Sequence, residues 1–140
     1  MKKALFILTF LLSGAAFAHD DATMAAMKAP NGGQLKMAGW YHFELVSKGS
    51  DVIIYITDHA NVAKPSKDVK GKLTILDGGK KQDITLTPAA PNLLKGKLNG
   101  KLGQKAKVLA SITFADGRTE QARYEMGASA NASADHSNHH

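Results

Sequence analysis

Apolar and polar residues alternate along most of the chain between residues 34 and 126. Such alternation places every second side chain on one face, which is typical of β-strands that bury a single face. The pattern predicts about eight strands, which lie near residues 34–37, 41–45, 52–57, 73–75, 84–86, 94–98, 106–114 and 122–126. The sequence between 34 and 126 does not show the 3.6-residue apolar period of a helix longer than one or two turns.

Turn residues separate the predicted strands at even intervals. The segments 77–80 (DGGK) and 115–118 (ADGR) each carry Asp-Gly between two alternating runs, which predicts two β-hairpins. Short strands with regularly spaced turns are typical of antiparallel sandwiches. We therefore expect an all-β fold, an antiparallel Ig-like β-sandwich of about eight strands, with a small β-barrel as the alternative.

The two ends of the chain lack this alternation. Residues 1–18 (MKKALFILTFLLSGAAFA) combine two lysines, a short apolar run and Ala-Phe-Ala, the pattern of a secretory signal peptide cleaved between Ala18 and His19. The apolar run is shorter than the ~20 residues that a membrane-spanning helix needs, so we expect no stable membrane insertion. The remaining chain is interpreted as a flexible His/Met-bearing arm (19–29), a β-sandwich domain (30–126) and a flexible His-bearing tail (127–140).

The chain of 140 residues contains no cysteine. This excludes disulfides, thiolate metal sites and cysteine nucleophiles, and it fits the periplasmic or secreted location that the signal peptide predicts. The motifs Gly-x-Ser-x-Gly and His-Glu-x-x-His and a Gly-rich phosphate loop are absent from the sequence as well. We therefore expect a protein that is not an enzyme.

The whole chain has a formal net charge of +6 at pH 7, and its lysines concentrate in the middle. Residues 64–107 hold eleven lysines against three aspartates. This excess is typical of a solvated sheet face, or of a surface that docks on an anionic partner. Because arginines and interleaved aromatic residues are lacking there, we expect no nucleic-acid partner.

Side chains that bind metals occur in both ends of the chain. After cleavage, His19 supplies a terminal amine and an imidazole that can chelate one ion, and Met24 and Met27 add thioethers. The tail contributes three imidazoles close together in sequence, those of His136, His139 and His140. Imidazole suits copper, nickel and zinc, whereas thioether sulfur prefers Cu(I), so the mixture favours a copper ion, with nickel or zinc as alternatives.

Two further histidines lie inside the predicted domain. His42 shares a strand face with Glu44, and His59 follows Asp58 at the end of the next strand. If these strands are neighbours, His59 lies near the start of the first one. His42, Glu44 and His59 are therefore candidate metal ligands, and a hydrogen-bonded surface histidine is the alternative interpretation for each imidazole.

Four segments resemble a family of small exported bacterial proteins: 30–46 (PNGGQLKMAGWYHFELV), 52–59 (VIIYITDH), 94–96 (LKG) and 121–125 (QARYE). Similar modules are present in the periplasmic adaptor subunits of heavy-metal efflux pumps of the resistance-nodulation-division class. The resemblance covers roughly residues 30–126 and implies a β-sandwich and a part in heavy-metal handling. It adds weight to His42 and Glu44. Where this family has His or a second Gly-rich turn ahead of Gly-Gly, this chain has Pro30 and Asn31.

These observations predict a periplasmic protein that binds copper, or another divalent heavy metal, and buffers it or delivers it to a component of an efflux system. The ligands would come from the two His/Met-bearing ends and from His42 or His59. The alternative is an interaction module without a metal role, which docks through its Lys-rich sheet face.

Overall fold

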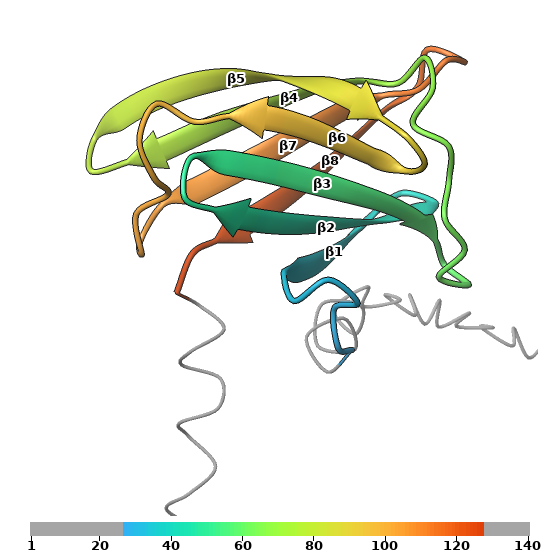
Figure 1. Ribbon diagram of the computed structural model, residues 1–140, viewed down its shortest axis with the longest axis horizontal. Helices are drawn as coiled ribbons and strands as arrows, with labels where there is room; N and C mark the ends of the chain where they lie inside the picture. Colours follow the sequence, from blue (N-terminus) through green and yellow to red (C-terminus); the bar gives the residue numbers. More distant parts are fainter. Residues whose placement is uncertain (1–26, 128–140) are drawn as a thin grey trace, which may run out of the picture.

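The computed structural model describes residues 27–127, which fold into eight antiparallel strands joined by turns and loops (Figure 1). The strands are β1 (Gln34–Ala38), β2 (Tyr41–Lys48), β3 (Asp51–Asp58), β4 (Lys70–Asp77), β5 (Lys80–Ala89), β6 (Leu93–Lys97), β7 (Lys107–Thr113) and β8 (Thr119–Glu125). No helix occurs in this range, and so none within it is long and apolar enough to cross a membrane. The predicted signal peptide, most of the predicted N-terminal arm and nearly all of the tail lie outside the described residues.

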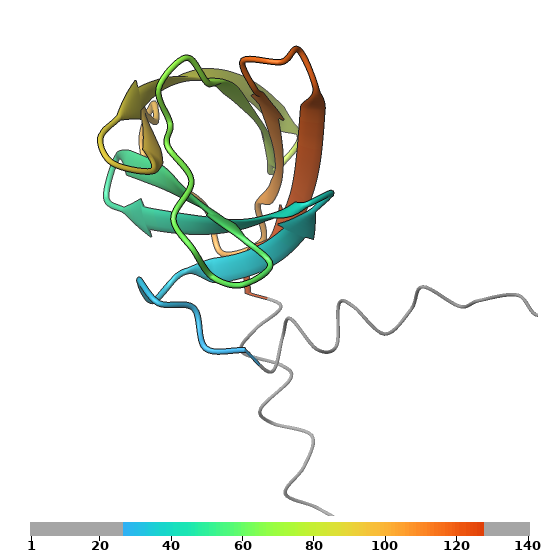
Figure 2. The same ribbon diagram turned by 90° about the vertical axis from the view of Figure 1, so that its right-hand side faces the viewer.

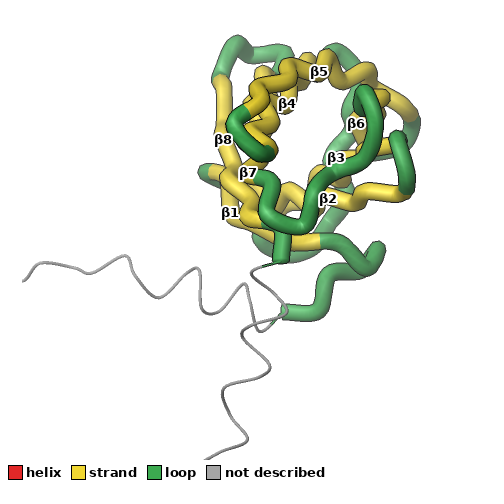
Figure 3. Tube along the Cα trace, turned by 90° about the vertical axis from the view of Figure 1, so that its left-hand side faces the viewer, coloured by secondary structure: helices red, strands yellow, loops and turns green. Residues whose placement is uncertain are grey.

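The strands form one continuous sheet in the order β1-β2-β3-β6-β5-β4-β7-β8. This sheet curls until its edge strands β1 and β8 lie side by side, which gives the ring seen from either end in Figures 2 and 3. The all-β class and the number of strands are thus confirmed, and the nearly closed ring corresponds to the barrel alternative. The cause is strand β5, which pairs with β4 along its first part and with β6 along its last three residues, joining what would otherwise be two sheets.

The predicted hairpins are also present. Asp77 pairs with Lys80 across the β4–β5 turn, and Thr113 pairs with Thr119 across the β7–β8 turn. The predicted alternation is seen as well, because the buried apolar side chains of β3, β4, β5, β7 and β8 come from every second position. On β6, glycine occupies the inward position 96, where a Cβ would lie 2.8 Å from a methyl group of Ile84.

Three contacts hold together the seam between the first two and the last two strands. The hydroxyl of Tyr124 on β8 donates a hydrogen bond of 2.8 Å to the carbonyl oxygen of Phe43 on β2. The ring of Tyr41 stacks on that of Phe114, just after β7, with centroids 4.2 Å apart. The amide of Gln34 on β1 also donates to a backbone carbonyl at the end of β8, at 3.4 Å.

The segment between β3 and β4 crosses one end of the ring (Figure 2). Ser66 in this segment is buried, and its hydroxyl donates a hydrogen bond of 2.8 Å to the carbonyl oxygen of Ala89. Val69 adds a buried side chain to the core. The segment is therefore part of the packed structure.

We expect the substitution Tyr124→Phe to destabilise the fold by about 1–2 kcal/mol, because the buried carbonyl of Phe43 loses a donor while the packing of the ring is retained. Urea unfolding followed by circular dichroism measures the change. The control is Tyr55→Phe, since Tyr55 is only half-buried and lies outside the core. Equal stability of the Tyr124 variant and the wild type would contradict the role of this hydrogen bond.

Candidate functional site

Strand β2 is buried on both of its faces. Phe43 and Leu45 point into the core, so His42, Glu44 and Val46 point outward, yet they are only 4%, 2% and 8% exposed. Alternation alone places such residues in solvent. The outward side chains are covered by the segment before β1 and by the loop after β3, and the polar ones need partners there.

The carboxylate of Glu44 binds the segment before β1. It accepts hydrogen bonds from the backbone N–H of Asn31 at 3.1 and 2.9 Å, from the Asn31 side-chain amide at 3.0 Å and from the backbone N–H of Gly33 at 2.9 Å. A side chain at Gly33 would collide with the carbonyl oxygen of Leu45, so only glycine allows this close approach. Both carboxylate oxygens thus hold the segment before β1 against β2.

The loop after β3 is organised by Asp58. Its carboxylate accepts hydrogen bonds from the backbone N–H groups of Ala60 at 2.9 Å and Val62 at 3.0 Å, and it pairs with the ammonium of Lys64 at 3.0 Å. The hydrogen bond from Val62 and the one from Lys64 lower the pKa of Asp58 below its ordinary value. Asp58 is therefore ionised at neutral pH and holds the turn that carries His59 and Asn61.

Asn61 fixes the imidazole of His42. Asn61 has a positive φ of 61°, a conformation that asparagine tolerates better than most residues. Its side-chain oxygen lies 3.3 Å from Nδ1 of His42. Because that oxygen can only accept, Nδ1 carries the proton and Nε2 keeps its lone pair. Burial lowers the pKa of His42 below its ordinary value, and the nearby His59 lowers it further.

His59 is held over the β1–β2 hairpin. Its Nε2 lies 3.0 Å from the carbonyl oxygen of Gly39 and must donate to it, which leaves the lone pair on Nδ1. The imidazole of His59 stacks on that of His42, with centroids 5.1 Å apart and planes 25° apart. The exposed indole of Trp40 also lies near His59, with its ring centre 6.4 Å away.

The two histidines share the arrangement of metal-binding imidazoles, in which one ring nitrogen donates to an oxygen and the other keeps a free lone pair. Among residues 27–127, Nε2 of His42 and Nδ1 of His59 form no hydrogen bond. The structure thus brings together two of the residues that the sequence singled out, from two strands that are paired neighbours. This pair is the candidate functional site.

The other predicted ligands are placed differently. Glu44 lies two residues along β2 from His42, but its oxygens bind Asn31 and Gly33. Met27 is half-buried ahead of β1. The remaining candidates fall outside the described residues: His19, Met24, His136, His139 and His140. Within residues 27–127, no three side chains of the His, Cys, Asp and Glu types gather closely enough to hold a metal ion.

Sequence reasoning did not identify Asn61 as a partner of His42. The available signal is its place in Asp-His-Ala-Asn, because Asp followed closely by Asn is typical of a tight turn and Asn accepts positive φ. The hydrogen bond itself depends on the pairing of β2 with β3, which brings the turn back to the start of β2.

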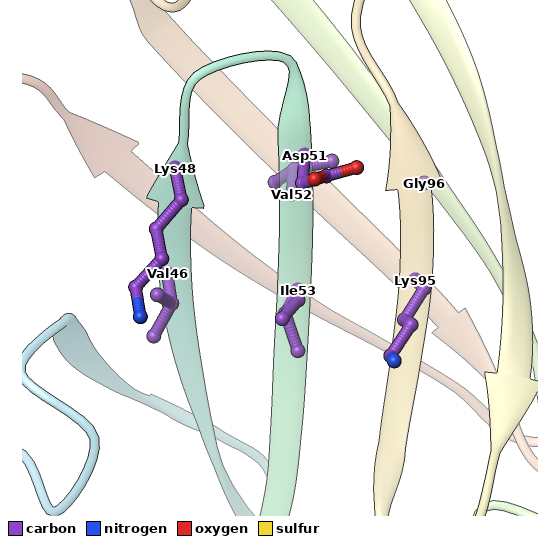
Figure 4. Close-up of a pocket in the computed structure, with 7 residues that line it drawn as sticks. All are labelled: Val46, Lys48, Asp51, Val52, Ile53, Lys95 and Gly96. Carbon is purple, nitrogen blue, oxygen red and sulfur yellow. The ribbon is translucent and has the colours of Figure 1, made fainter.

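A shallow hollow lies elsewhere on the outer face, across β2, β3 and β6 (Figure 4). It has a volume of about 210 Å³, with Val46 and Ile53 between the side chains of Lys48 and Lys95. It contains none of the predicted ligands. Its lining is mainly aliphatic and lysine side chains, and its one carboxylate, that of Asp51, pairs with Lys97.

Comparison with protein-family models, with curated proteins and with solved structures finds no match for this chain.

The substitution Glu44→Gln should destabilise the protein by about 1–3 kcal/mol, since an amide accepts at one oxygen only and its NH₂ group would face a backbone N–H. Amide hydrogen exchange at Asn31 and Gly33 should become faster. The matched control is Glu125→Gln on the exposed face of β8. Unchanged exchange at Asn31 and Gly33 would show that Glu44 does not hold this segment.

His42 should titrate below the ordinary histidine value of about 6.5. Since its pKa is lowered in the folded state, its contribution to stability is complete above pH 6.5 and is lost as pH falls through 6.5 toward the folded pKa. A titration of the ring C–H signals by NMR measures this pKa, and the same residue in urea serves as the reference. A folded pKa at or above the reference would contradict the effect of burial.

Proposed function

We propose that this protein binds a copper ion, or another divalent heavy metal, after export to the periplasm, and that it buffers the ion or delivers it to an efflux system. The observation that supports this most directly is the stacked pair His42 and His59. Each imidazole is oriented by an acceptor oxygen, and each keeps one free nitrogen. The proposed role is binding and transfer of the ion, without a catalytic step.

Copper is favoured over harder ions by the kind of donors. Neutral imidazole nitrogens suit copper, nickel and zinc, whereas the buried carboxylate of Glu44, the kind of donor that magnesium and calcium prefer, is used within the fold. The lowered pKa of His42 keeps its imidazole neutral at the pH where a metal ion would bind. The resemblance of residues 30–46 and 52–59 to modules of heavy-metal efflux adaptors supports the same role.

Docking on an anionic partner is the second candidate function. The lysines of strands β6, β5, β4 and β7 lie on consecutive strands of the sheet, which favours one basic side of the barrel. Part of this charge is compensated, because Lys72 and Lys81 lie 4.0 and 3.9 Å from Asp83, and Lys97 lies 2.6 Å from Asp51. Exposed pairs of this kind contribute little energy but do reduce the local field. The histidine pair is therefore the better-supported site.

Two substitutions remove one metal-binding nitrogen each while keeping the hydrogen bond of the ring. His42→Asn retains an N–H group near the position of Nδ1, and His59→Gln retains one near Nε2. Each variant should bind Cu(II) at least about tenfold more weakly than the chain of residues 19–140, because half of the paired ligands is lost. A chain that lacks residues 128–140 is the control for the tail histidines and should retain this binding.

Trp40 provides the readout for this titration. It is the single tryptophan of the sequence and lies beside His59, so bound copper should quench its fluorescence. Affinities are measured against a competing chelator, and Cu(II) affinity should fall as pH drops through about 6.5 because protonated imidazoles do not bind. If only the truncation weakens binding, the tail holds the ion. If no chain binds, the metal function is wrong and docking through lysines becomes the leading candidate.

A further inference from the structure

Met37 lies directly opposite His42 in the register of β1 and β2. Directly opposite residues of an antiparallel pair point to the same face, and their Cβ atoms are about 4.5–5.5 Å apart. Met37 is half-buried on this outer face. A thioether is therefore within side-chain reach of the imidazole of His42.

The same hairpin also holds the second imidazole. β1 and β2 are joined by Gly39 and Trp40, and the carbonyl oxygen of Gly39 accepts the hydrogen bond from His59. Met37, His42 and His59 thus come from β1, from β2 and from the loop after β3. Backbone pairing of the three strands and the bond to Gly39 fix these segments relative to one another.

We propose that Met37, His42 and His59 form one three-ligand site for a soft monovalent ion, Cu(I) or Ag(I). This inference rests on the proposed function and adds to it the third ligand and the class of ion. The kinds of side chain near the histidine pair also favour a methionine as the third ligand. Among residues 27–127, no three His, Cys, Asp or Glu side chains are placed so that they could hold one metal ion, so a three-ligand site at the histidine pair needs a donor of another type.

The chemistry of the three donors favours a monovalent ion. Thioether sulfur is a soft ligand that selects Cu(I), and two neutral imidazoles add nitrogen donors without adding negative charge. The nearest buried carboxylate, that of Glu44, is engaged by the backbone of Asn31 and Gly33. The carboxylate of Asp58, next to His59 in the sequence, is engaged by the loop and by Lys64. Both nearby carboxylates thus already have partners within the fold, and Cu(I) and Ag(I) need no anionic ligand.

Packing is the alternative role for Met37, because methionine is an adaptable hydrophobic side chain. The substitution Met37→Leu separates the two roles. It conserves the volume of the side chain, so stability should change little, but it removes the sulfur. Met126→Leu is the matched control, since Met126 is also partly buried and packs against the core, at the other end of the described chain.

The experiment measures binding of Ag⁺ in chloride-free buffer, and of Cu(I) under reducing conditions, by competition with a chelator of known affinity. The chain tested is 19–140 with Met24 and Met27 changed to Leu, so that thioethers of the arm do not contribute. Met37→Leu should weaken Ag⁺ and Cu(I) binding at least about tenfold and leave Cu(II) binding within about twofold. Met126→Leu should change neither.

A second measurement does not depend on a variant. The ε-methyl NMR signal of Met37 should shift when Ag⁺ is added, while that of Met126 should stay in place. One outcome is that Met37→Leu has no effect and the methyl signal of Met37 in the unsubstituted protein does not move, while His42→Asn and His59→Gln still abolish binding. In that case Met37 is not a ligand, and the proposed function stands. If none of the three variants changes binding of any ion, the histidine pair is not the site, and if no chain binds any ion, the proposed function itself is wrong.

Discussion

Strand β2 is covered on both faces, and this constraint determines how the neighbouring segments fold. A polar group buried without a partner costs about 1–3 kcal/mol, so each outward polar residue of β2 must be satisfied by the chain that covers it. Glu44 takes the backbone N–H groups of Asn31 and Gly33, and His42 takes the side-chain oxygen of Asn61. The segment before β1 and the loop after β3 are thus held against the barrel by two polar side chains of one strand.

The same constraint explains why the two histidines are oriented in advance. Asp58 organises the loop through the N–H groups of Ala60 and Val62, and the loop then presents both Asn61 and His59 to β2. Each imidazole has its tautomer fixed by an oxygen acceptor. Outer hydrogen bonds of this type orient ligands before an ion arrives, so less side-chain freedom is lost on binding.

Much of the fold could be predicted from the alternation of residues, because the inward positions of a strand follow from its period of two. The alternation could not decide between a sandwich and a barrel, since this depends on β5 pairing with β4 at one end and with β6 at the other. Proximity of His42 and His59 was predicted on the condition that their strands pair, which they do. The hydrogen bonds of Glu44 could not be predicted, because their donors are mainly backbone N–H groups, which leave no pattern in the sequence.

The exposure of the two imidazoles bears on how an ion would be exchanged. His42 is 4% exposed and fixed near the start of β2, whereas His59 is exposed and lies in a loop beside the exposed Trp40. An ion at this pair would have protein on the side of His42 and solvent on the side of His59. A ligand from a partner could then approach from the open side and displace His59 first, while His42 still holds the ion. Such stepwise exchange suits delivery better than permanent storage, because a fully enclosed site would have to open before the ion could leave.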